Sequence, residues 1–334
     1  MWLNIIDAYK AHKSKLIGIS YRITGSLSES EDIVHETFIR WFDADHKTIE
    51  SPYFWLVTVA TRLSLDYLKR ASVKRQLYIG EWLPEPFVED YIGEWAMEPC
   101  CDDKLMPEYQ YEMDESISMA LVVLLDKLSP PERATFILHD LFHFDFDEVG
   151  EILGRTGMSC RKLASRARAK INPDRISHRP TYGEHVEVVS AFFAAVKNGD
   201  LADLVTLLKA NVTFHSDGGG KAPAALTVLK GSAVVAGFVS EKMSLNCFDK
   251  PPRVMRVWFN GSPGFVIVAN GNPISAFNFE VSDRKINKIH ALRNPDKLLP
   301  FKKFLSKEGT EPIPVVNGDI PSSRSTSVLS PEKE

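Results

Sequence analysis

Residues 145–170, DFDEVGEILGRTGMSCRKLASRARAK, decide the fold of the segment around them. Apolar residues recur at helical spacing on both sides of Gly154-Arg155-Thr156, which predicts two short helices joined by a tight turn. The second helix turns small and apolar residues inward and basic residues outward. This arrangement is typical of a helix-turn-helix, whose second helix enters the major groove of DNA.

The outward residues of that second helix are candidates for DNA contact because their cationic and hydroxyl groups can hold phosphates or bridge base edges. They are Ser159, Arg161, Lys162, Ser165, Arg166 and Arg168. The alternative is a basic, solvated helix in an ordinary helical bundle. The short turn and the absence of any acidic residue between 155 and 170 favour the DNA interpretation.

Charge is strongly segregated along the 334 residues, although the net charge is only −4. Residues 62–75 and 155–170 are basic, whereas residues 81–115 are acidic apart from Lys104. Two basic segments joined by an acidic connector fit a protein that holds nucleic acid at two places. The connector also carries four prolines, Pro84, Pro86, Pro99 and Pro107, which argue against a long helix and predict a linker with short structured pieces.

The remaining periodicity predicts helices before the linker and an α+β domain near the C-terminus. Residues 51–70 carry an apolar helical face, and Ser28 with Glu31 resembles a capping box that opens an earlier helix. After residue 181, one helix ends at Asn198-Gly199 and Asp200 caps the next. The predicted strands form an antiparallel meander with Asn-Gly turns at 260–261 and 270–271, and span residues 254–259, 265–269, 274–281 and 286–292.

Several classes of protein are excluded by composition. No run of about 18 apolar residues predicts a membrane span, and the N-terminus lacks the pattern of a signal peptide. The four cysteines, Cys100, Cys101, Cys160 and Cys247, lack zinc-site spacing and predict reduced thiols. We therefore expect a cytoplasmic protein without a metal, a cofactor or a membrane partner.

Two blocks of sequence resemble extracytoplasmic-function sigma factors of bacterial RNA polymerase. Residues 145–154 with Leu163-Ala164-Ser165-Arg166-Ala167-Arg168 are similar to the promoter-reading fourth domain of that family. Ile19-Ser20-Tyr21-Arg22, residues 31–38 and Pro52-Tyr53-Phe54-Trp55-Leu56 are similar to its second domain. The resemblance implies two all-α domains, a helical bundle and a helix-turn-helix, that bind core polymerase and promoter DNA.

The resemblance also implies roles for individual residues. Asp32, Glu36, Phe38 and Trp41 would dock on the β′ clamp helices, and the helix-turn-helix domain would meet the β flap. Arg62, Asp66, Lys69 and Arg70 would approach the −10 element, and the outward residues of the second helix the −35 element. Core packing is the alternative for Phe38 and Trp41, and it is also the interpretation favoured for Trp55.

Three further motifs resemble one subgroup of the family, in which a SnoaL-like domain of the nuclear-transport-factor-2-like (NTF2-like) fold follows the sigma domains. The resemblance implies that they form a regulatory interface. They are Trp82-Leu83-Pro84-Glu85-Pro86, Asp217-Gly218-Gly219-Gly220-Lys221 and Asn294-Pro295-Asp296-Lys297-Leu298. The expected domains are a sigma region 2 domain (1–78), an acidic linker (79–115), a region 4 domain (116–173), a SnoaL-like domain (182–300) and a flexible tail (301–334).

The C-terminal domain leaves more than one function open. SnoaL-like domains often enclose a conical pocket, which would admit an unidentified small ligand, and some relatives use an acid–base carboxylate or histidine. His215, Asp217 and His290 are the candidates for such catalysis here, although a structural role is favoured for each. A DNA-binding regulator that never meets polymerase and a SnoaL-like enzyme tethered to DNA are the alternatives to a sigma factor that the C-terminal domain regulates in cis.

Overall fold

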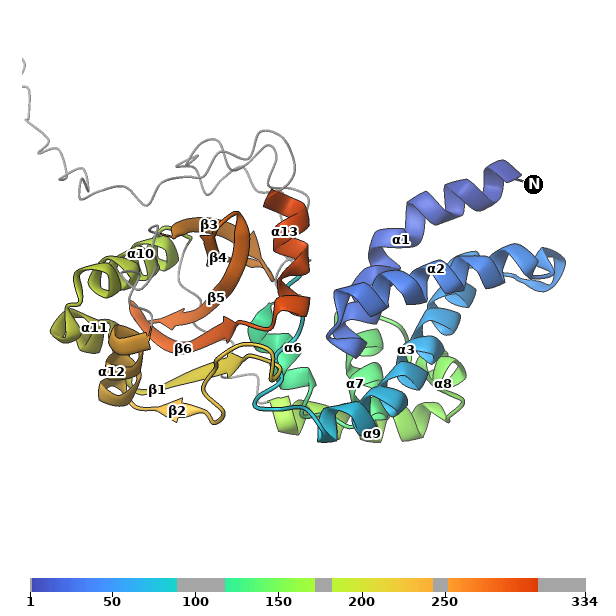
Figure 1. Ribbon diagram of the computed structural model, residues 1–334. Helices are drawn as coiled ribbons and strands as arrows, with labels where there is room; N and C mark the ends of the chain where they lie inside the picture. Colours follow the sequence, from blue (N-terminus) through green and yellow to red (C-terminus); the bar gives the residue numbers. More distant parts are fainter. Residues whose placement is uncertain (1, 89–117, 172–181, 243–251, 306–334) are drawn as a thin grey trace, which may run out of the picture.

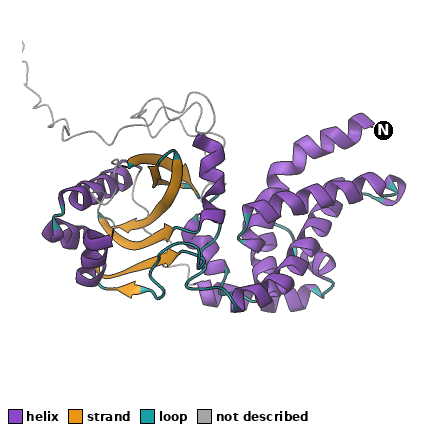
Figure 2. Cartoon of the chain, viewed as in Figure 1, coloured by secondary structure: helices purple, strands orange, loops and turns teal. Residues whose placement is uncertain are grey.

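The computed structural model describes residues 2–88, 118–171, 182–242 and 252–305. Figure 1 shows one group of helices beside a sheet-containing domain, with the strands confined to the latter in Figure 2. Cys100, Cys101, Cys247, most of the acidic connector and most of the expected tail lie outside the described residues.

The helical half contains two sets of helices. The first set is α1 (Trp2–Thr24), α2 (Leu27–Asp43), the short 3₁₀ helix η1 (His46–Thr48) and α3 (Pro52–Gln76). The second set is α6 (Met119–Leu125), α7 (Pro130–Phe136), the π-helical turn η2 (Ile137–Leu141), α8 (Phe146–Leu153) and α9 (Gly157–Ile171). The expected all-α fold of this half is confirmed.

The predicted helix-turn-helix is formed by α8 and α9. Asp145 and Glu148 make a reciprocal capping box that begins α8, and Gly154 ends it in the left-handed conformation with φ 64°. The buried side of α9 consists of Gly157, Cys160, Leu163, Ala164, Ala167 and Ile171. These local signals explain why the motif was recognisable in the sequence.

The start of α2 differs from the prediction. Ser26, not Ser28, is the N-cap, because its hydroxyl accepts a hydrogen bond from the Glu29 backbone N–H. The helix therefore begins before the predicted capping box. Ser28 instead donates to the carboxylate of Glu85 in the linker.

The two sets of helices share one hydrophobic core. Phe144, in the loop before α8, stacks on Tyr53 with ring centroids 6.0 Å apart and lies 6.4 Å from the ring of Phe54. Arg133 of α7 donates to the backbone oxygen of Ile23 in α1 at 2.7 Å. The two predicted DNA-reading modules are therefore packed against each other in this structure.

The C-terminal half is the expected α+β domain with a curved sheet. Its helices are α10 (Tyr182–Asn198), α11 (Leu201–Leu207), α12 (Ser232–Lys242), the 3₁₀ turn η5 (Pro295–Leu298) and α13 (Leu299–Leu305). Its strands are β1 (Leu208–Asp217), β2 (Leu229–Lys230), β3 (Arg253–Phe259), β4 (Ser262–Ala269), β5 (Asn272–Ser282) and β6 (Lys285–Leu292). Gly199 and the Asp200 cap separate α10 from α11 as predicted.

The sheet order is β2-β1-β6-β5-β4-β3. The four predicted strands pair antiparallel, but β1, which was not predicted, pairs parallel to β6 and makes the sheet mixed. The parallel pairing is possible because β1 and β6 are connected through the rest of the domain instead of a tight hairpin.

Both faces of the sheet are covered. Helices α10, α11 and α12 pack on one face, as Figure 1 shows. The other face packs against Leu83 of the linker, Met119 of α6 and Phe301 of α13. The prediction that residues 301–305 belong to a flexible tail is wrong, because they continue α13 and Phe301 is fully buried against Phe259, at 5.0 Å between ring centroids.

Candidate DNA and polymerase interfaces

The exposed side of α9 carries all six of the predicted DNA-contacting residues, but their environments differ. Arg168 forms an ion pair with Asp140 at 2.6 Å, and Arg161 lies over the ring of Phe146 at 5.5 Å. Arg166 approaches Glu132 at 3.6 Å. These three arginines are held at the flanks of the helix by their own domain. Lys162 and Ser165 lie between the flanks and have no side-chain partner among the described residues.

Glu132 fixes one flank of α9. It accepts from Lys170 at 2.7 Å and from the Ser129 hydroxyl at 2.8 Å, within the capping box that begins α7. The hydrogen bond from Lys170 is the main reason why the pKa of Glu132 falls to about 2, and the bonds from Ser129 add to it. The carboxylate therefore stays ionised and holds α9 against α7.

The candidate −10 residues on α3 are only partly available. Arg62 donates from Nε to the Ile152 oxygen at 2.9 Å and from its terminal nitrogen to the Glu151 oxygen at 3.1 Å. Its guanidinium thus lies at the C-terminal end of α8, where a cation is favoured by the helix dipole. Asp66 and Lys69 pair with each other at 2.8 Å on the exposed side, and Arg70 is exposed.

Burial corrects the prediction of polymerase-docking residues on α2 for two of the four residues. Phe38 and Trp41 are 8% and 5% exposed and belong to the shared core, so neither side chain is presented to a partner. Asp32 is exposed, and Glu36 pairs with Arg40 at 2.8 Å. The large apolar side chains on the outside of α2 are instead Ile39 and Phe42, which the sequence analysis did not single out.

The subgroup motifs meet at a buried junction between the linker and the C-terminal domain. Asp217 is 0% exposed and accepts from the Tyr78 hydroxyl at 2.5 Å, from the Leu83 backbone N–H at 2.9 Å and from Lys297 at 2.6 Å. Lys297 also donates to the Leu83 oxygen and lies 4.4 Å from the centre of the Trp82 ring. Burial and the adjacent Asp217 carboxylate keep the pKa of Tyr78 well above its ordinary value, so the phenol remains a donor.

Close packing at the junction explains two of the glycines. A Cβ at Gly219, which has φ 57°, would collide with the Asn294 side chain and lie 2.9 Å from the Tyr78 oxygen. A Cβ at Gly25, in the turn between α1 and α2, would lie 2.6 Å from the Trp82 ring. Trp82 therefore packs directly on the first set of helices. Lys221 of the glycine motif pairs with Asp296, which joins two of the motifs at the surface.

Glu85 connects the linker to α2. Its carboxylate accepts from the Ser26 hydroxyl at 2.9 Å and from the Ser28 backbone N–H at 3.0 Å, at the N-terminus of the helix. A carboxylate is favoured there by the helix dipole and the unpaired N–H groups. The linker thus completes the N-terminal cap of the helix on which polymerase docking was predicted.

Asn260 connects the C-terminal domain directly to the first set of helices. It lies in the β3–β4 turn with φ 52°, is fully buried, and donates to the Tyr21 hydroxyl of α1 at 2.7 Å. Its side-chain oxygen accepts from the Phe87 backbone N–H at 3.0 Å, and its own N–H donates to the Phe87 oxygen at 2.9 Å. Tyr21 in turn donates to the Glu85 oxygen at 2.6 Å. Sequence analysis identified Asn260 only as a turn residue.

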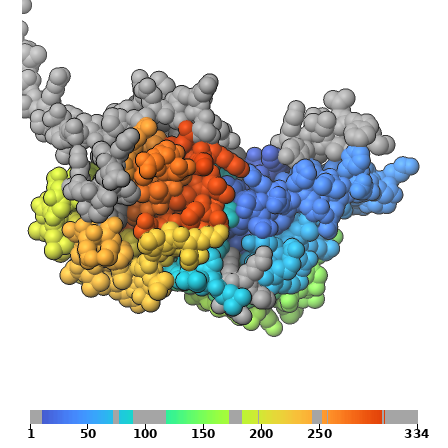
Figure 3. Space-filling model, viewed as in Figure 1, coloured from blue at the N-terminus to red at the C-terminus, as the bar shows by residue number. Residues whose placement is uncertain are grey.

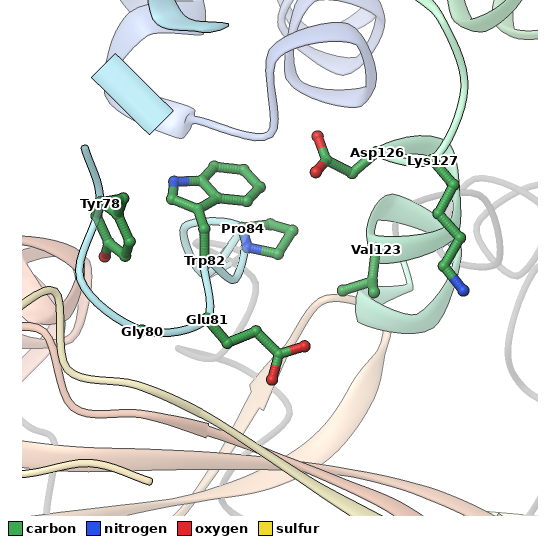
Figure 4. Close-up of a pocket in the computed structure, with 8 residues that line it drawn as sticks. All are labelled: Tyr78, Gly80, Glu81, Trp82, Pro84, Val123, Asp126 and Lys127. Atoms are coloured by element: carbon green, nitrogen blue, oxygen red, sulfur yellow. The ribbon is translucent and has the colours of Figure 1, made fainter. Parts of the chain in front are cut away.

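The linker crosses the gap between the two halves of the molecule. Figure 3 shows this segment between the C-terminal domain and the helical half. A pocket of about 380 Å³ lies between residues 78–84 and the C-terminal end of α6 with the two residues that follow it. Figure 4 shows the side chains that line it. The lining residues are Tyr78, Gly80, Glu81, Trp82, Pro84, Val123, Asp126 and Lys127.

The three candidates for catalysis do not form an acid–base site. Asp217 is committed to the junction. His215 binds Glu81 at 2.7 Å and Thr213 at 3.0 Å, under the linker. His290 is fully buried beside His215, and burial holds its pKa well below the ordinary value, so it stays neutral. Within the described residues, no group of His, Cys, Asp and Glu side chains is arranged to hold a metal ion, and no helix is long and apolar enough to span a membrane.

Comparison with known proteins defines the class. Residues 8–73 match the Sigma-70 region 2 family and residues 118–171 match the Sigma-70 region 4 family. The chain therefore belongs to the extracytoplasmic-function RNA polymerase sigma factors, which are transcription initiation factors and not enzymes. The α+β fold expected for the C-terminal domain is confirmed by its mixed sheet with packed helices.

Individual relatives support this assignment over most of the chain. The chain is 39% identical over 236 residues to the sigma factor SigJ of Mycobacterium tuberculosis, covering 70% of this chain and 72% of SigJ. It is 29% identical over 301 residues to the probable sigma factor SigI of the same species, covering 89% and 96% of the two chains. The crystal structure of SigJ superposes with a TM-score of 0.68 at 32% identity, over 88% of this chain and 98% of that one.

Proposed function

We propose that this chain binds core RNA polymerase and directs promoter-specific initiation, and that its C-terminal domain regulates that activity in cis. Polymerase docking would use the exposed side of α2, where Asp32, Glu36, Ile39 and Phe42 would meet the β′ clamp helices. The second set of helices, α6 to α9, is called the second sigma module below, and it would meet the β flap. The −35 element would be read by α9 and the −10 element by α3. This proposed function would place the protein in the cytoplasm, together with the polymerase.

The observation that supports cis regulation is the set of contacts from the C-terminal domain to the linker and to α1. Asp217 and Lys297 hold the linker, and Asn260 holds both the linker and Tyr21. In the same arrangement Arg62 is engaged with α8. A sigma factor that needs Arg62 for promoter DNA would have to leave this arrangement, so the contacts restrain promoter engagement. Any ligand or partner that binds more tightly to an open arrangement, in which these contacts are broken, would activate the sigma factor.

Asn260 offers a sharper test than removal of the domain, because truncation would uncover the apolar contacts of Leu83 and Met119. Glycine tolerates the left-handed backbone of Asn260 and deletes its side-chain contacts, which include those to Tyr21 and Phe87. The matched control is Asn270→Gly, in the neighbouring Asn-Gly turn. Asn270 has φ 51°, is exposed, and lies away from the linker contacts.

The measurement is run-off transcription by core polymerase with each full-length variant, from promoters mapped by sequencing RNA 5′ ends. Loss of hydrogen bonds worth about 1 kcal/mol each shifts the closed-to-open ratio roughly fivefold or more, so Asn260→Gly should raise transcription while Asn270→Gly does not. Equal activity of all three proteins would refute cis regulation through this contact. A decrease confined to Asn260→Gly would show that the closed arrangement assists initiation.

A further inference from the structure

The exposed side of α9 has a centre and two flanks. At about 100° per residue, the residues opposite the buried stripe are Met158, Lys162, Ser165 and Ala169. The arginines lie to either side and are tied to Phe146, Glu132 and Asp140. A helix that enters a groove presents its centre to the base edges and its flanks to the phosphates on the two sides. The centre is therefore where sequence would be read.

Met158 is the unexpected member of this centre. It is 67% exposed, in the first turn of α9, and the nearest residues of the centre, Lys162 and Ser165, are basic and hydroxylic. Arg155, Arg161 and Lys162 surround it in sequence, so it does not extend an apolar patch. Its chemistry is that of a flexible, polarizable side chain that adapts its shape to an apolar partner.

The major groove offers one apolar group, the C5-methyl of thymine. The first residues of a recognition helix contact the base edges in the groove, and this end of α9 is capped by the Thr156 hydroxyl, which accepts from the Ser159 backbone N–H at 3.2 Å. We propose that Met158 is a specificity-determining residue that packs on the methyl group of a thymine in the element read by α9. The inference rests on the proposed function, since it requires α9 to read promoter DNA.

The first step of the test is to find the sequences that the protein selects. Holoenzyme made from core polymerase and the full chain is used to select from a randomised DNA duplex library. Each enriched thymine is then replaced singly by deoxyuridine, which removes only the methyl group. For one thymine, the replacement should weaken binding about three- to fivefold, on the order expected for burying one methyl group.

The second step assigns that effect to Met158. In Met158→Ala holoenzyme the thymine and deoxyuridine duplexes should bind equally, and Met158→Leu should restore part of the preference. Lys162→Ala is the matched control, because it alters the same face without an apolar contact. It should weaken both duplexes by the same factor and leave the thymine preference unchanged.

The outcomes separate the two proposals. If Met158→Ala keeps the wild-type thymine preference, or if no enriched thymine depends on its methyl group, the inference about Met158 is overturned while promoter recognition stands. If the library yields no enriched sequence, promoter recognition by this chain fails and the inference fails with it. Because Met158 is exposed, Met158→Ala should fold normally, which the unchanged unfolding midpoint of the variant would verify.

Discussion

Helices α3 and α9 are the two candidate DNA-reading helices, and they differ in which parts of the chain their polar side chains bind. The face of α3 is tied to other parts of the chain: Arg62 binds the end of α8, and Tyr78, two residues beyond the helix, is held by Asp217. Among the described residues, the charged flanks of α9 are tied within the second sigma module, through Glu132 and Asp140. Regulation by the C-terminal domain would therefore act on the α3 side and leave α9 exposed for DNA.

The strongest test of this difference removes the charge at the junction. Asp217→Asn leaves Lys297 buried without its carboxylate, and breaking a buried ion pair in this way costs about 3–5 kcal/mol. We expect a lower free energy of unfolding and faster amide exchange in the C-terminal turns of α3. Amide exchange in α9 should be unchanged. The measurement is denaturant unfolding combined with hydrogen exchange.

An exposed ion pair supplies the control for this substitution. Asp283 pairs with Lys209 at 2.6 Å and is largely exposed, so Asp283→Asn should change stability by at most about 1 kcal/mol. Equal acceleration of exchange in α3 and α9 after Asp217→Asn would contradict the comparison, because it would show that the junction holds both helices.

A smaller effect is expected from the contact that fixes α9. Glu132→Gln removes the charge that holds Lys170 and Arg166 and should cost about 1–3 kcal/mol, with faster exchange in α9 and no change in α3. The exposed Glu241, which pairs with its neighbour Lys242, supplies the control Glu241→Gln. A response in α3 as large as that in α9 would show that the second module is not self-contained.

The pH dependence of this contact has a defined sign. The pKa of Glu132 is lowered from its ordinary value of 4.5 to about 2 by its hydrogen bonds, chiefly that from Lys170. A lowered native pKa stabilises the fold fully above the ordinary value, and this contribution is lost as the pH falls from about 4.5 to about 2. The stability difference between wild type and Glu132→Gln should therefore shrink over that interval.

Local patterns predicted much of the fold. The tight turn at Gly154 and the two Asn-Gly turns depend on neighbours within a few residues, so their signals are complete in the sequence. Strand β1 was missed because its pairing with β6 joins residues far apart in the chain. Family resemblance located the junction motifs, but not the bonds that Asp217 makes to Tyr78 and Leu83.

The candidate sites were less predictable because their state depends on distant partners. Arg62 has the charge and the position of a DNA-contacting residue, yet its acceptors lie about 90 residues along the chain. Phe38 and Trp41 occupy positions that suit either a core or an interface, and only packing distinguishes the two. Met158 escaped a search for cationic and hydroxyl groups because its relevance comes from exposure, which sequence alone does not reveal.

The smallest predicted effect measures the link between α3 and the second module directly. The ammonium of lysine carries its donors on one nitrogen and lacks the planar fork with which Arg62 reaches the Glu151 and Ile152 oxygens from two nitrogens, so Arg62→Lys should cost about 1 kcal/mol in unfolding free energy. Arg70→Lys, on the exposed part of the same helix, should stay within about 0.5 kcal/mol of wild type.

The same pair of variants tests whether this link restrains the molecule. If Arg62 couples α3 to α8, then Arg62→Lys should increase amide exchange at the α8–α3 contact, and combining it with Asp217→Asn should give less than the sum of the two effects. Non-additivity is expected because both substitutions release α3 from the same closed arrangement. Strictly additive free energies would mean that the two contacts act independently, and the C-terminal domain would then have no influence on the DNA-facing side of α3 through this route.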